Sequence, residues 1–137
     1  MSNRLSYDVM NENGKWGNIL DIPSWYAKEL SDEIGLEYSK RVIVDEKTLG
    51  THLIAAQNLL KENENFLKEN EASKKVWQEM LSKAQTEVAA DKAMEMMNEY
   101  DHMILDTKEF VDAYQKIVVA LAILEQSYDL TISYYYG

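Results

Sequence analysis

A glutamate and a histidine three residues apart, Glu99 and His102, form the pattern in this sequence that comes nearest to a metal-binding motif. On a helix, side chains at this spacing lie on one face, so both can bind the same metal ion. Carboxylate-bridged metal centres in helical bundles use such a pair twice. Here the pair occurs once, because the only other histidine, His52, has Leu49 three residues before it. A carboxylate–histidine metal enzyme is therefore the third-ranked hypothesis, and we expect no metal or cofactor.

Other catalytic chemistry has little support. The chain has no cysteine, which excludes thiolate metal sites and cysteine nucleophiles. No serine lies in a Gly-x-Ser-x-Gly setting, and no glycine-rich loop of the phosphate-binding type is present. We therefore do not expect an enzyme.

Four acidic residues spaced by four form a column, which we call the acidic column: Glu87, Asp91, Glu95 and Glu99, with Asp101 nearby. On a helix the rise over four residues is about 6 Å, comparable with the distance between phosphates along one nucleic-acid strand. Such a helix would suit a basic groove built for DNA or RNA. The alternative is an ordinary solvated helix face, so we treat these five residues as candidate partner-binding residues.

Methionine and tyrosine residues supply a second set of candidates. Met96 belongs to a methionine-rich segment and does not share the apolar stripe of its neighbours, and exposed methionines are common at protein interfaces. Three consecutive tyrosines, Tyr134, Tyr135 and Tyr136, offer large amphipathic rings that also suit an interface. A tail docked on its own domain is the alternative interpretation for the tyrosines.

The overall charge limits the classes of partner that the protein is expected to bind. With 137 residues and a net charge of −10, the chain is acidic, and most of that charge follows residue 45. A strongly acidic protein is a poor ligand for nucleic acid or for an anionic membrane. The first residues lack the apolar run of a signal peptide, and the longest apolar run, residues 117–124, is too short to span a bilayer. We expect a cytoplasmic protein.

The elements that position these residues follow from the glycines and the proline. All but the terminal glycine, together with the single proline, lie within the first fifty residues, where we expect the turns and strands. Asn13-Gly14 predicts a two-residue hairpin turn. A helix should begin at Pro23 and end at Gly35, with Trp25, Leu30 and Ile34 inside. Residues 41–44 are β-branched and predict a short strand.

After Gly50 the pattern is helical, because apolar residues recur at helical spacing without glycine or proline until the terminus. A first helix should start near Thr48 and lapse at residues 70–73, where Ser73 would cap a second helix. A third should start near Thr107, because Asp106 and Glu109 have the spacing of a capping box. The partly alternating pattern of residues 130–136 predicts either a strand or an extended tail.

The resulting prediction is a mainly α protein: an antiparallel bundle of three long helices and one shorter helix, with a small N-terminal β-hairpin region and α+β as the alternative class. We expect one domain over residues 1–137, with a mixed region at 1–47 and the bundle at 48–137. The leading functional hypothesis is a small, acidic, non-enzymatic protein-binding module. A phage-type inhibitor, which would block a basic nucleic-acid-binding protein through its acidic helix, is its specific form. The alternative is a self-assembling structural subunit that forms a homo-oligomer.

Overall fold

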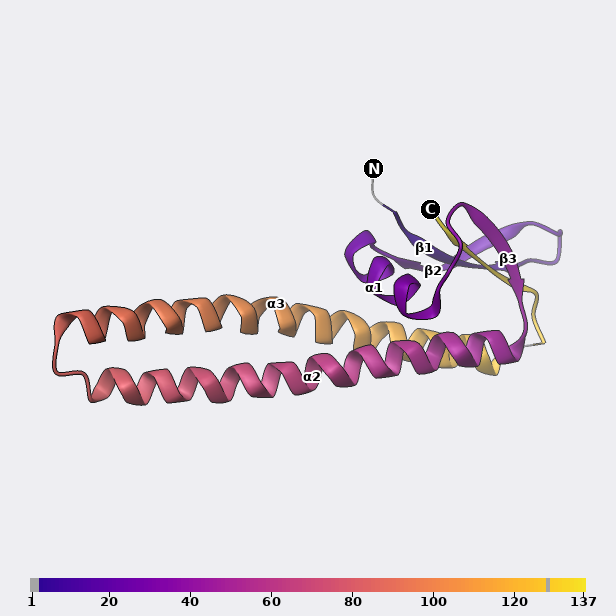
Figure 1. The fold of residues 1–137 in the computed structure, drawn as a ribbon. Coiled ribbons are helices and arrows are strands. Elements are labelled where there is room, and N and C mark those ends of the chain that lie inside the picture. The colour runs from indigo at the N-terminus through magenta and orange to yellow at the C-terminus, as the bar shows by residue number, and fades with distance from the viewer. Residues whose placement is uncertain (1–2, 128) are drawn as a thin grey trace. The chain divides into compact units, whose positions relative to one another are not determined.

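The computed structural model describes residues 3–127 and 129–137, which fold into three helices and a four-stranded sheet (Figure 1). The elements are β1 (Leu5–Met10), β2 (Trp16–Ile22), α1 (Ser24–Ile34), β3 (Lys40–Val44), α2 (Glu46–Ser82), α3 (Glu87–Gln126) and β4 (Ile132–Tyr136). They form two compact units, unit 1 (Met1–Leu59 and Ala113–Gly137) and unit 2 (Leu60–Asp112). The boundary between the two units lies within both long helices, between residues 59 and 60 and between residues 112 and 113. The change in amino-acid composition along the sequence lies elsewhere, near residue 47.

The sheet of unit 1 is antiparallel throughout, in the order β2-β1-β4-β3. The predicted strand at 41–44 is present as β3. The C-terminal residues form β4, a central strand paired with both β1 and β3. The two ends of the chain therefore meet, since Arg4 and Gly137 exchange backbone hydrogen bonds of 2.9 and 3.0 Å.

The predicted hairpin joins β1 and β2, but its loop is longer than two residues. The amide of Asn11 bonds the carbonyl of Lys15, and the amide of Gly14 bonds the carbonyl of Asn11. Gly14 has a φ of 74°, whereas Asn13 has no positive φ. This combination is the three-residue loop in which a glycine in the left-handed region follows a turn, not the type I′ turn that two positive φ angles would require.

Helix α1 begins and ends as expected, with Pro23 at its N-cap and Gly35 in the left-handed conformation at its C-cap. Its inner face is Ala27, Leu30 and Ser31. Trp25 is exposed instead of buried, which corrects the predicted inner face. The reason is geometric: at about 100° per residue, Trp25 lies on the side of the helix opposite Ile34.

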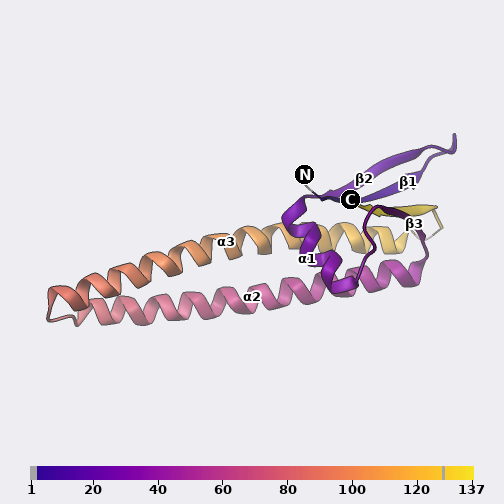
Figure 2. The ribbon, with the colours of Figure 1, turned by 45° about the horizontal axis from the view of Figure 1, so that its top comes forward.

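One face of the sheet carries α1, the first turns of α2 and the last turns of α3, all within unit 1 (Figure 2). Tyr7 of β1 bonds His52 of α2, and Tyr114 of α3 donates to the Tyr26 carbonyl of α1. Further fully buried side chains complete this core: Leu5, Ile22, Leu30, Leu49, Leu121 and Ile132.

The helical region contains two long helices and one short one, so the predicted bundle of three long helices plus a shorter one is wrong in its count. The chain passes through residues 70–73 as continuous helix, with Asn70 buried instead of ending it. It also passes through Thr107, whose hydroxyl bonds the carbonyl of Met103 within the same helix instead of capping a new one. The real break is at residues 83–86, where the hydroxyl of Thr86 accepts a hydrogen bond from the amide of Ala89 and caps α3.

Unit 2 is an antiparallel hairpin made of the second part of α2 and the first part of α3 (Figures 1 and 2). The two helices face each other through stripes that repeat every seven residues, as in a coiled coil. The stripe of α3 runs through Ala93, Ile104, Thr107 and Val111, and that of α2 through Leu67, Asn70, Trp77 and Leu81. Within the described residues, neither of these helices nor α1 combines the length and apolarity that a bilayer crossing requires.

Candidate protein-binding surface

The acidic column lies on the exposed surface of α3 in unit 2, and all four of its carboxylates are exposed. Glu95 is 3.8 Å from Lys92, while the neighbouring Asp101 pairs at 2.6 Å with Lys74 of α2. Four residues along an α-helix rotate by about 400° about the helix axis, which is about 40° more than one full turn. The column therefore winds around α3 from one side of the hairpin to the other.

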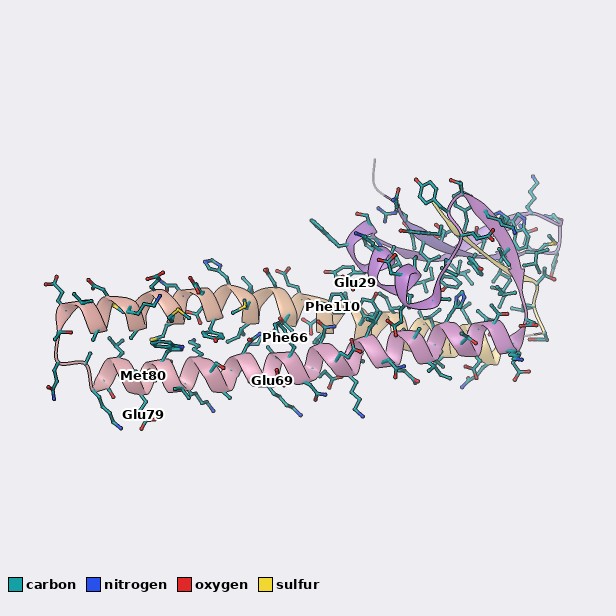
Figure 3. The ribbon with its side chains drawn as sticks, in the orientation of Figure 1. Glu29, Phe66, Glu69, Glu79, Met80 and Phe110 are labelled. Atoms are coloured by element: carbon teal, nitrogen blue, oxygen red, sulfur yellow. The ribbon has the colours of Figure 1, made fainter. Side chains whose placement is uncertain are left out.

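A second feature of the hairpin was not anticipated: one of its sides is lined by large apolar residues. Phe66 and Met80 directly precede Leu67 and Leu81 of the α2 stripe, and Ser73 lies seven residues from each of them. On α3, Met103 and Phe110 directly precede Ile104 and Val111, and Met96 lies seven residues before Met103. A local two-fold axis relates antiparallel helices, so equivalent positions lie on the same side of the pair. Figure 3 shows Phe66 and Phe110 at the same level of the hairpin. We call the five apolar residues the Phe/Met edge: Phe66, Met80, Met96, Met103 and Phe110.

The Phe/Met edge is accessible despite its apolar character. Phe66 is 45% exposed, Met80 49% and Met103 37%, while Met96 and Phe110 are half-buried. Two helices alone cannot cover such a stripe, because their mutual contact is taken up by the stripes between them. Exposed apolar side chains gathered on one side of a helix pair are a feature of binding sites for another macromolecule.

The opposite side of the hairpin is mainly charged, although it also carries the exposed Met94, seven residues before Asp101. It carries Glu64 and Glu71 of α2 and Asp101 and Lys108 of α3, and the Lys74–Asp101 ion pair crosses between the helices there. The two sides of the hairpin thus differ in chemistry, and Met96 belongs to the apolar one. Met96 lies off the main apolar stripe of α3 because it belongs to this edge.

The three C-terminal tyrosines have different positions. Tyr134 and Tyr136 face the core of unit 1 and are buried, which leaves their rings unavailable to a partner on this surface. Tyr135 points to the other face of the sheet and is half-buried. The alternation follows from β4 being a strand, in which successive side chains point to opposite faces.

Glu99 and His102 are both exposed on α3. Among the residues that the structure describes, no three His, Cys, Asp or Glu side chains come together as a metal site would require. The pair is thus without the additional carboxylate ligands that carboxylate-bridged metal centres use.

His52 is instead a core residue of unit 1. It is 1% exposed, its Nδ1 lies 2.7 Å from the Tyr7 hydroxyl, and its ring packs at 4.9 Å from that of Tyr134. Burial lowers the pKa of His52 to about 4 and raises that of Tyr7. Both side chains are therefore neutral at pH 7, and the cluster contributes to the packing of the core.

A charged residue missed by sequence reasoning is Arg41, on the sheet face opposite Tyr7. Its Nη1 donates to Asp8 Oδ2 at 2.7 Å and to Ser133 Oγ at 2.8 Å. The guanidinium also lies 5.4 Å from the ring centre of Trp16. Only the register of β3, β4 and β1 brings these residues together, so no local sequence signal marks them.

Unit 1 also has an open groove of about 350 Å³ beside β1 and the end of α3. The described residues that line it include no charged side chain: Val9, Ile19, Leu20, Ala120, Ile123, Leu124, Ser127 and Leu130. Small-molecule sites usually combine an apolar wall with a few placed polar groups. Ser127 is the single polar side chain among these described residues, and one hydroxyl offers little to orient a ligand.

Comparisons of the chain with protein-family models, with curated proteins and with solved structures found no match. The assignment of a function therefore rests on the surfaces described above.

Proposed function

We propose that this protein is a non-enzymatic protein-binding module whose partner docks on the α2–α3 hairpin of unit 2. The observation that carries the proposal is the Phe/Met edge, which exposes Phe66, Met80 and Met103 along one side of the hairpin. Protein-binding surfaces draw most of their affinity from a few large apolar or aromatic side chains near the centre of the contact. Methionine adds an adaptable surface that moulds to a partner.

The test is binding by the full chain after neutral substitutions at the edge. Tagged protein is used to capture partners from the lysate of the source organism, and the captured protein is then purified and titrated. Met80→Gln/Met103→Gln should weaken binding at least about tenfold, because it removes apolar contact while keeping charge and helix propensity.

The matched control is Val88→Gln/Met94→Gln, two exposed apolar residues of the same hairpin that lie off the edge. Equal affinity of both double variants and the parent protein would remove the Phe/Met edge from the proposal. Circular dichroism of each variant checks that the helices are retained.

The second candidate is the inhibitor form, in which the acidic column competes with nucleic acid for a basic partner. The exposure of all four carboxylates favours it, and their winding path around α3 counts against a single straight ridge. Asp91→Lys/Glu95→Lys should then abolish binding, and a DNA or RNA ligand of the purified partner should compete with the parent protein. Absence of competition would leave the column as a solvated face.

A further inference from the structure

The spacing of the Phe/Met edge matches the repeat of an α-helix in a coiled coil. Phe66, Ser73 and Met80 recur every seven residues on α2, and Met96, Met103 and Phe110 do so on α3. The span from Phe66 to Met80 is about 21 Å, or four helical turns. Ser73, opposite Met103, leaves a small residue in the middle of the stripe, which is where a larger side chain of a third helix would insert. An incoming helix would complete a three-helix bundle over this stretch.

Four carboxylates border this edge, and we call them the acidic rim: Glu62, Glu69, Glu99 and Asp106. Each lies three or four residues from an edge residue, on its outer side. Val76, which is exposed, holds the corresponding position beside Met80. The lysines Lys61, Lys68 and Lys75 recur along the other flank of α2, away from the edge. Only at the hairpin turn do lysines, Lys83 and Lys92, lie beside the edge.

From this arrangement we propose that the Phe/Met edge binds a basic amphipathic helix of a partner protein, an inference that rests on the proposed function. The apolar face of that helix packs on the edge, and its flanking lysines or arginines face the acidic rim. A second copy of this chain is the less favourable occupant. Residues 60–112 hold thirteen acidic and seven basic residues, a net charge of −6, so two copies brought together would repel.

The experiment titrates the full chain with two synthetic peptides of three heptads, in about 0.15 M salt. Both carry leucine at the apolar positions, and they differ only in having lysine and arginine or glutamate elsewhere. We expect the basic peptide to bind and to gain helicity, and the acidic peptide to fail. The Glu69→Lys/Asp106→Lys variant should bind the basic peptide at least about tenfold more weakly, because it reverses two charges of the acidic rim.

The control variant is Glu79→Lys/Glu109→Lys, which makes the same charge change on the outer surface of each helix. Figure 3 shows Glu79 pointing away from α3. Equal losses in the two charge variants, or equal binding of both peptides, would overturn the proposal. So would a dimer in sedimentation that the Met80→Gln/Met103→Gln variant dissociates, since the edge would then be occupied by a second copy.

The protein-binding function and the basic-helix partner can be disproved separately. If partner capture depends on Met80 and Met103 while the basic peptide does not bind, the protein-binding module stands and the basic helix is wrong. If capture is indifferent to the edge variants, the edge is not the docking surface and both fail.

Discussion

His52 is a buried base that its surroundings keep neutral. It lies between Tyr7 and Tyr134 in the core of unit 1, with no carboxylate among its ring contacts within the described residues. Burial lowers its pKa from 6.5 to about 4. Protonation is therefore coupled to unfolding, because between these two pH values His52 binds a proton in the unfolded chain but not in the native one.

This coupling predicts an acid-sensitive stability. As pH falls from about 6.5 to about 4, the unfolded chain gains a proton at His52 and the native chain does not, so the free energy of unfolding should fall by up to about 3 kcal/mol and then level off. His52→Gln should remove this part of the pH dependence. Denaturant unfolding of both proteins at several pH values measures it, and parallel curves would contradict it.

Arg41 acts on the other face of the sheet by neutralising Asp8, which is 7% exposed. Arg41→Met should leave this carboxylate with one charge-compensating partner fewer and lower the free energy of unfolding by about 1–3 kcal/mol. Lys40→Met on the same strand is the control, since its ion pair with Glu37 is exposed and should contribute little. A loss no larger than the control's would show that solvent replaces Arg41.

At the scale of the element, the hairpin of unit 2 has a polar residue in its contact stripe. Asn70 is 5% exposed, and its Nδ2 has no hydrogen-bond partner within the described part of the chain. A buried unpaired amide destabilises a helix pair, although polar residues at such positions can define the register.

Asn70→Leu should therefore raise the free energy of unfolding by about 1 kcal/mol, because it replaces an unpaired polar group with an apolar one of similar size. Asn65→Leu, at an exposed position of the same helix, is the comparison and should change stability little. Thermal unfolding followed by circular dichroism measures both. A destabilised Asn70→Leu protein would show that the amide has a partner in solution.

At the scale of the whole molecule, a net charge of −10 accompanies an exposed apolar edge. Charge repulsion opposes contacts between copies while the carboxylates are ionised. The charge vanishes near the sequence isoelectric point of about 4.6. The apolar edge is then no longer protected by repulsion.

Lowering the pH from 7 toward 4.6 should therefore cause self-association, and Met80→Gln/Met103→Gln should reduce it more than Val88→Gln/Met94→Gln does. Sedimentation velocity across this pH range measures the effect. Identical behaviour of the two double variants would assign the association to another surface. A parent protein that is already oligomeric at pH 7 would favour the self-assembling subunit.

Local patterns were enough for the elements that have local causes. Gly14, Pro23 and Gly35 marked turns and helix ends through their own backbone preferences. The helix boundaries at Ser73 and Thr107 were wrong because a capping pattern is also compatible with a helix interior. Thr107 satisfies its hydroxyl within the helix, and nothing near it forces the chain to turn.

By itself, the sequence determined the helical character after residue 50, the strand at 41–44, the acidity and the exposed carboxylates of α3, because composition and periodicity act through neighbours along the chain. Tertiary structure alone decided which residues meet. It placed β4 between β1 and β3, which buried Tyr134 and Tyr136, and it joined Asp8 to Arg41. It also set the register of the hairpin, and that register brings Phe66 and Met80 alongside Met96, Met103 and Phe110 on one side. Pairing between distant segments depends on the packing of the whole chain, and no local spacing encodes it.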